Sequence, residues 1–136
     1  MGPNNNNESF HNAWILWRIN NSNKCQERIV LLTNKSLYRV KYNFQDRKII
    51  HYKRLLLKDI KSIQKGFLDV TQRQYALALF TSSSDDSKNQ QVYVTNSALN
   101  IEESRILLED VINNIFEALM DSSVTIEEVS NIKKYK

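Results

Sequence analysis

Residue types that build specialised sites are scarce in this sequence of 136 residues, which has one cysteine, two histidines, one proline and two glycines. Cys25 has no partner for an internal disulfide, so we expect a reduced thiol. Cys25, His11 and His51 alone are too few for a metal cluster unless carboxylates join them, and we predict neither a metal site nor a cofactor. Gly2 and Gly66 lie too far apart for a glycine-rich phosphate loop.

The apolar runs of the chain are also short. None approaches the roughly 20 residues that a membrane-spanning helix needs, and no positively charged, apolar leader opens the sequence. Gly2 would suggest N-myristoylation, but Pro3 follows it and Asn6 stands where that signal has serine or threonine. We therefore expect a soluble, intracellular protein. Its 41% hydrophobic composition suits one domain with its own core.

Charges of opposite sign are concentrated in different parts of the chain. Residues 14–81 contain fourteen basic and four acidic residues, a net charge of +10, whereas residues 82–136 carry a net charge of −5. The overall charge of +4 conceals this separation. Because such a concentration raises the local density of anions near one surface, the candidate ligands are anionic lipid headgroups and phosphates.

Short segments rich in β-branched and aromatic residues predict seven strands, separated by turn residues. The strands are expected at residues 14–19, 26–32, 36–42, 48–56, 60–64, 75–81 and 91–95. Residues 82–89, which are rich in serine and aspartate, are expected to form a loop. Residues 1–12, which include four consecutive asparagines, are expected to be disordered because such a polar tract cannot offset its ordering entropy.

The hydrophobic period changes near residue 100. An apolar stripe at three- and four-residue spacing predicts an amphipathic helix that packs on a core, starting at Asn100 or Ser97 and ending at residues 121–123. Its members are Leu108, Val111, Ile112, Ile115, Phe116 and Leu119. Thr125 is expected to cap a short second helix. The resulting fold class is mainly β: a seven-stranded barrel or sandwich of the pleckstrin-homology (PH) type over residues 13–121, capped by its helix, with residues 122–136 as a short helix or tail.

Residues 26–44 resemble a known module. They contain QERIVLLTNKSL and, from residue 40, VKYNF, similar to the ERIVLLTDKSLL…KYDF signature of the human Sac-two homology domain. The apolar residues of its continuation are matched by Leu57, Ile60, Ile63, Gly66 and Phe67, and its aromatic first strand by Trp14 and Trp17. The resemblance covers about residues 13–95. Asn43 replaces the aspartate of the signature, and the loop before Tyr75 is short.

The Sac-two homology domain accompanies a Sac-type inositol phosphatase and forms most of the Mover-like presynaptic proteins. The resemblance implies a PH-like fold and self-association into dimers. It also implies a cytoplasmic protein that is peripheral on phosphoinositide-bearing endosomal or vesicle membranes. A ligand of that kind requires cations that converge on one phosphorylated ring, since arginine offers a bidentate fork and lysine a mobile charge.

Basic residues on the predicted strands are the candidate ligands for such an anion. Because side chains alternate along a strand, Arg39 and Lys41 share one face, and strand pairing would bring Arg28 beside one of them. The predicted lipid- or anion-binding residues are Arg18, Lys24, Arg28, Arg39, Lys41, Lys48, Lys53 and Arg54. The alternative interpretation is that these side chains form only a solvated face of the sheet.

A second set of residues is assigned to an interface. Trp14 and Trp17 lie on opposite faces of a regular first strand, so one is expected in the core and the other exposed. We assign Trp17 to a dimer or membrane contact. Three apolar residues near the C-terminus either pack on the barrel or bind a second subunit, and we include them in the predicted interface: Ile126, Val129 and Ile132.

We predict no enzymatic activity. His11 and His51 lack a nucleophile at a suitable spacing, and Leu31 stands where the Sac phosphatase motif has an arginine after its cysteine. The predicted function is a PH-like binding and dimerisation module that targets a protein to anionic, phosphoinositide-containing membranes. The alternative is a protein-protein interaction or homodimerisation domain without lipid binding. Nucleic-acid binding is not expected, because no recognition helix or RNA-binding aromatic motif is present.

Overall fold

The computed structural model describes residues 8–68, 74–81, 90–96, 98–119 and 124–132. Within these ranges, eight strands form one sheet in the order β4-β3-β2-β1-β7-β6-β5-β8. The strands are β1 (Phe10–Ile19), β2 (Cys25–Thr33), β3 (Ser36–Asn43), β4 (Lys48–Leu56), β5 (Ile60–Leu68), β6 (Tyr75–Thr81), β7 (Gln90–Val94) and β8 (Thr125–Ile132). A 3₁₀ turn, η1 (Leu57–Asp59), precedes β5, and α1 spans Ile101–Ala118. The prediction of a mainly β fold with a helix after the seventh strand is therefore confirmed.

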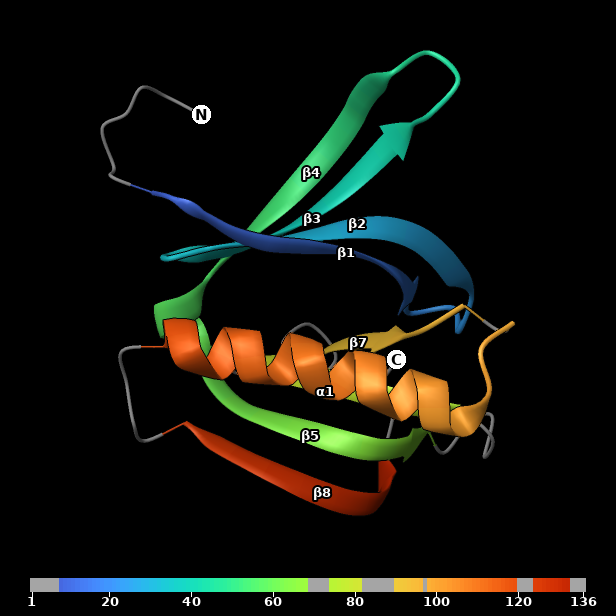
Figure 1. Ribbon diagram of the computed structural model, residues 1–136, viewed down its shortest axis with the longest axis vertical. Coiled ribbons are helices and arrows are strands. Elements are labelled where there is room, and N and C mark those ends of the chain that lie inside the picture. The colour runs from blue at the N-terminus through green and yellow to red at the C-terminus, as the bar shows by residue number, and fades with distance from the viewer. Residues whose placement is uncertain (1–7, 69–73, 82–89, 97, 120–123, 133–136) are drawn as a thin grey trace.

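The sheet bends around α1, which lies between the β1–β2 half and the β5–β8 half (Figure 1). The main core fills this concave side, where Leu16, Leu77 and Tyr93 of the sheet meet Leu108 and Ile112 of the helix. A smaller cluster lies on the opposite face of β1, β5, β6, β7 and β8. Its buried members are Ile19, Leu68, Ala76, Ala78, Val92, Val94 and Ile132.

The helix begins where its sequence predicts. Asn100 accepts a hydrogen bond from the backbone N–H of Glu103, and the Glu103 side chain accepts one from the backbone N–H of Asn100, which completes a capping box. The predicted apolar stripe is buried at Leu108, Val111, Ile112 and Ile115. Phe116 is the exception, since 49% of it is exposed at the margin of the buried face.

The β3–β4 hairpin projects from the rest of the sheet (Figure 1). The pairing of β2 with β3 ends at Ile29 and Val40, whereas β3 and β4 stay paired as far as Asn43 and Lys48. Asn43 shapes the turn, because its Oδ1 atom accepts hydrogen bonds from the backbone N–H groups of the second and third residues after it, at 2.9 and 3.0 Å. An asparagine therefore does here what the aspartate of the family signature would do.

The N-terminal prediction is wrong for residues 8–12. Strand β1 begins at Phe10, inside the segment expected to be disordered, and pairs there with Thr33 at the end of β2. Just before it, the Glu8 side chain is only 2% exposed and binds Arg54 of β4. The strand extends this far because Glu8 is bound to β2, β3 and β4, an interaction that a polar N-terminal sequence does not reveal.

The predicted short second helix is also wrong, because residues 125–132 form β8, parallel to β5. Ile126 pairs with Ile63, and Val129 pairs with Gly66 on the other face of the strand. A one-residue irregularity follows, so that Ile132 pairs with Leu68 and shares the face of Val129. A two-faced strand with a bulge therefore reproduces the three-residue spacing of a helix.

β8 is an eighth strand and carries the sheet beyond the predicted boundary at residue 121. The strands β1 to β7 match the predicted segments, with β1 and β5 longer than expected. The predicted helix end at residues 121–123 is wrong, because α1 ends at Ala118 and the backbone of Leu119 is already extended. The predicted loop at 82–89, Ser97 and the first seven residues lie outside the described ranges. None of the helices described here is long and apolar enough to cross a membrane.

Candidate anion-binding site

Three arginines from neighbouring strands lie on the concave face of the sheet. Arg18 pairs with Gln26, and Arg28 pairs with Leu16, whose side chain is in the main core. Arg39 pairs with Val30, which is two residues from Arg28 and on the same face. Arg18, Arg28 and Arg39, called the arginine cluster below, are all partly buried.

Gln26 connects two members of the arginine cluster. Its Oε1 atom accepts hydrogen bonds from Nη1 of Arg18 at 2.8 Å and from Nη2 of Arg28 at 3.3 Å. Nη1 of Arg28 also donates to the backbone carbonyl of Glu27 at 2.7 Å. These bonds hold the guanidinium groups of Arg18 and Arg28 side by side without an anionic partner.

The arginine cluster is electrostatically strained. Burial lowers the pKa of Arg18, and the positive charges of Arg39 and Arg28 lower it further. Burial and the charge of Arg39 likewise lower the pKa of Arg28. The lowered pKa values mean that partial desolvation and the neighbouring positive charges disfavour the charged forms of Arg18 and Arg28. An anion bound among the three side chains would stabilise their charged forms through its opposite charge.

Tyr93 of β7 lies next to this cluster. It pairs with Arg18, its ring is buried, and its hydroxyl donates a hydrogen bond to Oε1 of Gln91 at 3.0 Å. Burial raises the pKa of Tyr93, while the positive charges of Arg39, Arg18 and Arg28 act in the opposite direction. The Tyr93 side chain is therefore a buried, neutral phenol that lies beside the guanidinium groups.

Carboxylates compensate other basic residues but not this cluster. Glu8 pairs with Arg54, Glu109 with Lys65 at 3.4 Å, and Glu128 with Arg105 at 3.4 Å. Among the described residues, no carboxylate oxygen lies within 4.0 Å of the side-chain nitrogens of the arginine cluster. Among the described residues, no carboxylate oxygen lies within 4.0 Å of the side-chain nitrogens of four predicted lysines either: Lys24, Lys41, Lys48 and Lys53.

Three of the predicted lysines share the face of the arginine cluster. Lys53 pairs with Arg39, Lys41 pairs with His51, and Lys48 pairs with Asn43, so all three lie on the concave side of the β3–β4 hairpin. A directly opposed pair of like charges such as Arg39 and Lys53 destabilises a sheet. Lys24 is exposed in the turn that precedes β2.

Arg54 lies apart from the other predicted ligands. It pairs with Tyr38 on the opposite face of the hairpin, and its guanidinium lies 6.0 Å from the centre of the Tyr38 ring. It forms an ion pair with Glu8, and its Nε donates to Oγ of Ser36 at 2.9 Å. Arg54 is thus engaged in holding the N-terminal segment against the sheet.

The predicted interface residues contact the chain's own sheet. Ile132 is fully buried in the smaller cluster, and Val129 and Trp17 pack against that cluster. Ile126 packs against the main core. Trp14 lies on the concave face, as the predicted alternation requires, and its Nε1 donates to Oδ2 of Asp110 at 3.2 Å.

Two residues of the site were not predicted from the sequence. Gln26 could have been found, because it lies two positions before Arg28 and therefore shares its face in a strand. Tyr93 could not, since only the pairing of β1 with β7 brings it to Arg18. Within the described part of the chain, no group of histidine, cysteine and acidic side chains is arranged to hold a metal ion.

Comparison with known protein families identifies the family of this chain. A family model described as hSac2, inositol phosphatase, matches residues 2–97. The chain belongs to the hSac2 family. No curated protein matches the sequence.

Solved structures agree with this assignment. The hSac2 domain from the human phosphoinositide phosphatase Sac2 is 20% identical, with a TM-score of 0.74, and the match covers 93% of this chain and 80% of that one. The DH/PH fragment of PDZRHOGEF, solved with human RhoA, is 16% identical at a TM-score of 0.56, covering 81% of this chain and 29% of that one. The C-terminal domain of an unknown protein from Leishmania infantum is 12% identical at a TM-score of 0.51. The match covers 80% of this chain and 85% of that one.

At these identities the solved structures show the fold alone, which for this hSac2 domain is PH-like. The hSac2 domain is a non-catalytic domain, separate from the phosphatase domain. Because the solved hSac2 match covers 93% of the chain, it extends beyond the 2–97 range of the family model.

Proposed function

We propose that this hSac2 domain is a non-catalytic module that binds phosphoinositide headgroups on membranes through the arginine cluster. The observation that carries the proposal is the convergence of three partly buried guanidinium groups without a carboxylate among the described residues. A phosphorylated inositol ring offers several anionic oxygens at once, and guanidinium groups bind such oxygens in a bidentate manner. The ligand would provide the charge compensation that the described residues do not.

The position of the lysines supports binding at a membrane surface. Lys41, Lys48 and Lys53 share the concave face with the arginine cluster and continue it along the projecting hairpin. Each basic residue close to an anionic leaflet contributes about 1 kcal/mol, an attraction that fades within a Debye length. The lysines would therefore give general, salt-sensitive attraction, while the partly buried arginines would select the headgroup.

The proposal includes a peripheral location on cytoplasmic endosomal or vesicle membranes and no catalysis by this domain. A phosphatase nucleophile of the cysteine type needs a depressed pKa, because the thiolate is the reactive form. Burial instead raises the pKa of Cys25, which lies at the start of β2. A raised pKa keeps the Cys25 thiol protonated, which supports a binding role rather than a catalytic one.

Liposome sedimentation tests the proposal. Wild-type protein should pellet with vesicles that contain phosphoinositides, both in low salt and in physiological salt. The double variant Arg18→Gln with Arg28→Gln should lose most of this binding, whereas Lys61→Gln, an exposed change on β5, should retain it. The absence of phosphoinositide-dependent pelleting in both salt conditions, or full binding by the double variant, would overturn the proposal.

The second candidate function is homodimerisation or protein binding without lipid. Exposed apolar side chains on the outer face of β1–β4 favour it. Ile15 is 50% exposed and lines a shallow depression with Val40, Tyr42 and Phe44. A stable interface would bury such residues. Sedimentation equilibrium should then show a concentration-dependent dimer that Ile15→Ser weakens, and a monomer that binds no protein partner would exclude this candidate.

A further inference from the structure

Strand β4 has one unpaired edge. It pairs with β3 on one side and ends the described sheet on the other. Its regular part, His51–Leu55, pairs residue by residue with Leu37–Lys41. Lys48 to Arg54 are all exposed, and within the described residues their backbone groups form no hydrogen bond outside the β3–β4 ladder. The free edge is therefore an available template for another extended segment.

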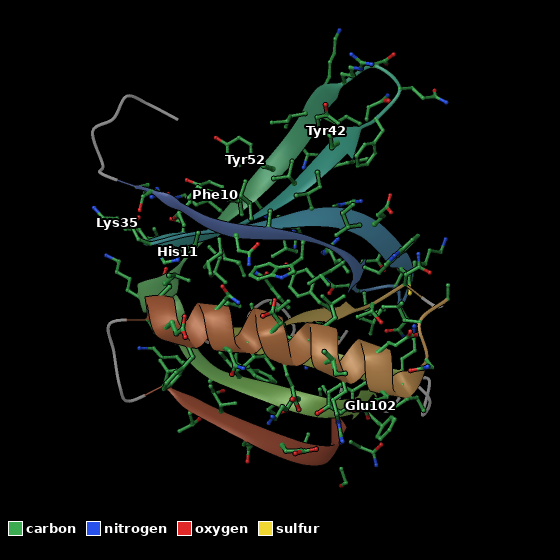
Figure 2. The ribbon with its side chains drawn as sticks, in the orientation of Figure 1. Phe10, His11, Lys35, Tyr42, Tyr52 and Glu102 are labelled. Carbon is green, nitrogen blue, oxygen red and sulfur yellow. The ribbon has the colours of Figure 1, made fainter. Side chains whose placement is uncertain are left out.

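The two faces of this edge differ in chemistry. On the concave face, His51 and Lys53 lie opposite Lys41 and Arg39. On the outer face, the Tyr52 ring is 59% exposed and meets the Tyr38 ring edge to face at 5.8 Å. Figure 2 shows Tyr52 on the projecting hairpin, away from α1. A strand added beside β4 would meet positive charge on one side and an aromatic surface on the other.

Protection against aggregation explains only part of this arrangement. Lysines and an irregularity are common devices that keep exposed edges from pairing. Such protection does not account for the apolar side chains, since Ile49, Ile50 and Tyr52 are 60%, 52% and 59% exposed on the same strand. Three of the nine large exposed hydrophobic residues in the described ranges thus lie on β4, which indicates a surface that a partner covers.

Charge selects the kind of partner. Antiparallel pairing of β4 with the β4 of a second copy would bring lysines and Arg54 of both chains together, and like charges across a ladder are destabilising. An acidic segment would instead place carboxylates beside His51 and Lys53. Its backbone would complete the ladder while its apolar side chains cover Tyr52.

We propose that β4 accepts an extended acidic segment of a protein partner as a ninth strand of the sheet. In this segment acidic residues alternate with apolar ones. The acids lie beside His51 and Lys53 on the concave face, and an apolar side chain packs on Tyr52. This inference does not depend on the proposed lipid function, because it uses the edge of β4 rather than the arginine cluster.

The direct test uses a labelled eight-residue peptide in which glutamate and valine alternate, in buffer without lipid. Fluorescence anisotropy should show saturable binding to the full chain, and hydrogen exchange should slow at amides of His51–Leu55. The same peptide with methylated backbone nitrogens keeps its charges but cannot donate to a ladder, so we expect its affinity to fall at least tenfold. A peptide with lysine in place of glutamate should not bind.

Variants separate the edge from other basic surfaces. Lys53→Glu should weaken peptide binding about tenfold, and it also removes a like-charge pair with Arg39, so loss of folding is not expected. Lys61→Glu on β5 is the matched charge reversal and should bind normally. The double variant Arg18→Gln with Arg28→Gln should also bind the peptide, even where lipid binding is lost.

Three results would overturn the inference. They are equal binding of the methylated peptide, absence of protection at β4 amides, and a homodimer in which β4 is already covered. Failure of vesicle binding alone would not affect it.

Discussion

Replacing Gly66 by alanine tests the docking of β8, the element whose sequence resembles a helix. A Cβ atom at residue 66 would lie 2.1 Å from the backbone carbonyl oxygen of Val129, and contacts below 3.0 Å are essentially never seen. Gly66 also has a φ of +159°, at the limit of the range that side chains avoid. Alanine therefore forces the backbone of β8 away from β5 by about 1 Å.

The expected loss in the free energy of unfolding of Gly66→Ala lies between two limits. If β8 shifts but stays attached, the penalty is that of overpacking, typically about 1–3 kcal/mol. If β8 separates, the protein also loses the burial of Ile132, which is 0% exposed, a contribution of about 1.5–3 kcal/mol. We expect the free energy of unfolding to fall by about 2–4 kcal/mol, which a domain of ordinary stability survives.

Urea unfolding followed by tryptophan fluorescence measures this loss, and hydrogen exchange at β8 amides locates it. Ser130→Ala is the control, because this exposed residue lies in the bulge of β8. Ile132→Ala should cost about 2–5 kcal/mol by itself and less in the Gly66→Ala background, since both changes weaken the same contact. An unchanged unfolding midpoint with intact β8 protection in Gly66→Ala would refute the reasoning.

Three further outcomes are expected. Glu8→Gln should lower stability by about 1–3 kcal/mol at neutral pH, because the buried carboxylate binds Arg54 and three hydroxyl groups. Burial raises the pKa of Glu8, but its hydrogen bonds and the charge of Arg54 lower it below 4.5, so its contribution is complete above pH 4.5 and disappears as the pH falls through the lowered value. Denaturant midpoints of wild type and variant that stay equally far apart down to pH 2 would contradict this assignment. Asn100→Ala should cost about 1 kcal/mol in thermal unfolding, and Asn100→Ser should restore most of it, because only the capping bond with Glu103 changes. Arg28→Gln should raise the urea midpoint while it weakens vesicle binding, because burial and Arg39 lower the pKa of Arg28 and so disfavour its charge in the fold; a lower midpoint would argue against repulsion in the cluster.

Much of the candidate site could be predicted because alternation along a strand is a local property. Arg39 and Lys41 share a face in any regular strand, and Lys53 and Arg54 cannot. For Lys48 alternation alone is misleading, because it would place this side chain with Arg54. Only the irregularity in the pairing of β3 with β4 moves Lys48 to the face of Lys53. Arg18 is different, since its place beside Arg28 depends on the turn that pairs it with Gln26.

Interactions that join distant parts of the chain were not predictable in this way. Glu8 follows a polar tract and gains its role only from β2, β3 and β4, which surround its carboxylate. The three-residue spacing of the apolar side chains in β8 fits a helix equally well. It becomes a strand because Gly66 leaves room for its backbone beside β5.

The sequence by itself therefore determined seven strands, the capped amphipathic helix and the concentration of positive charge before residue 82. Each of these follows from residue spacing or from contacts a few positions apart. The tertiary structure decided which basic residues converge, which one pairs with Glu8, and that the C-terminal segment extends the sheet. These outcomes depend on register and on close approach between distant segments, which hydrophobic periodicity does not encode.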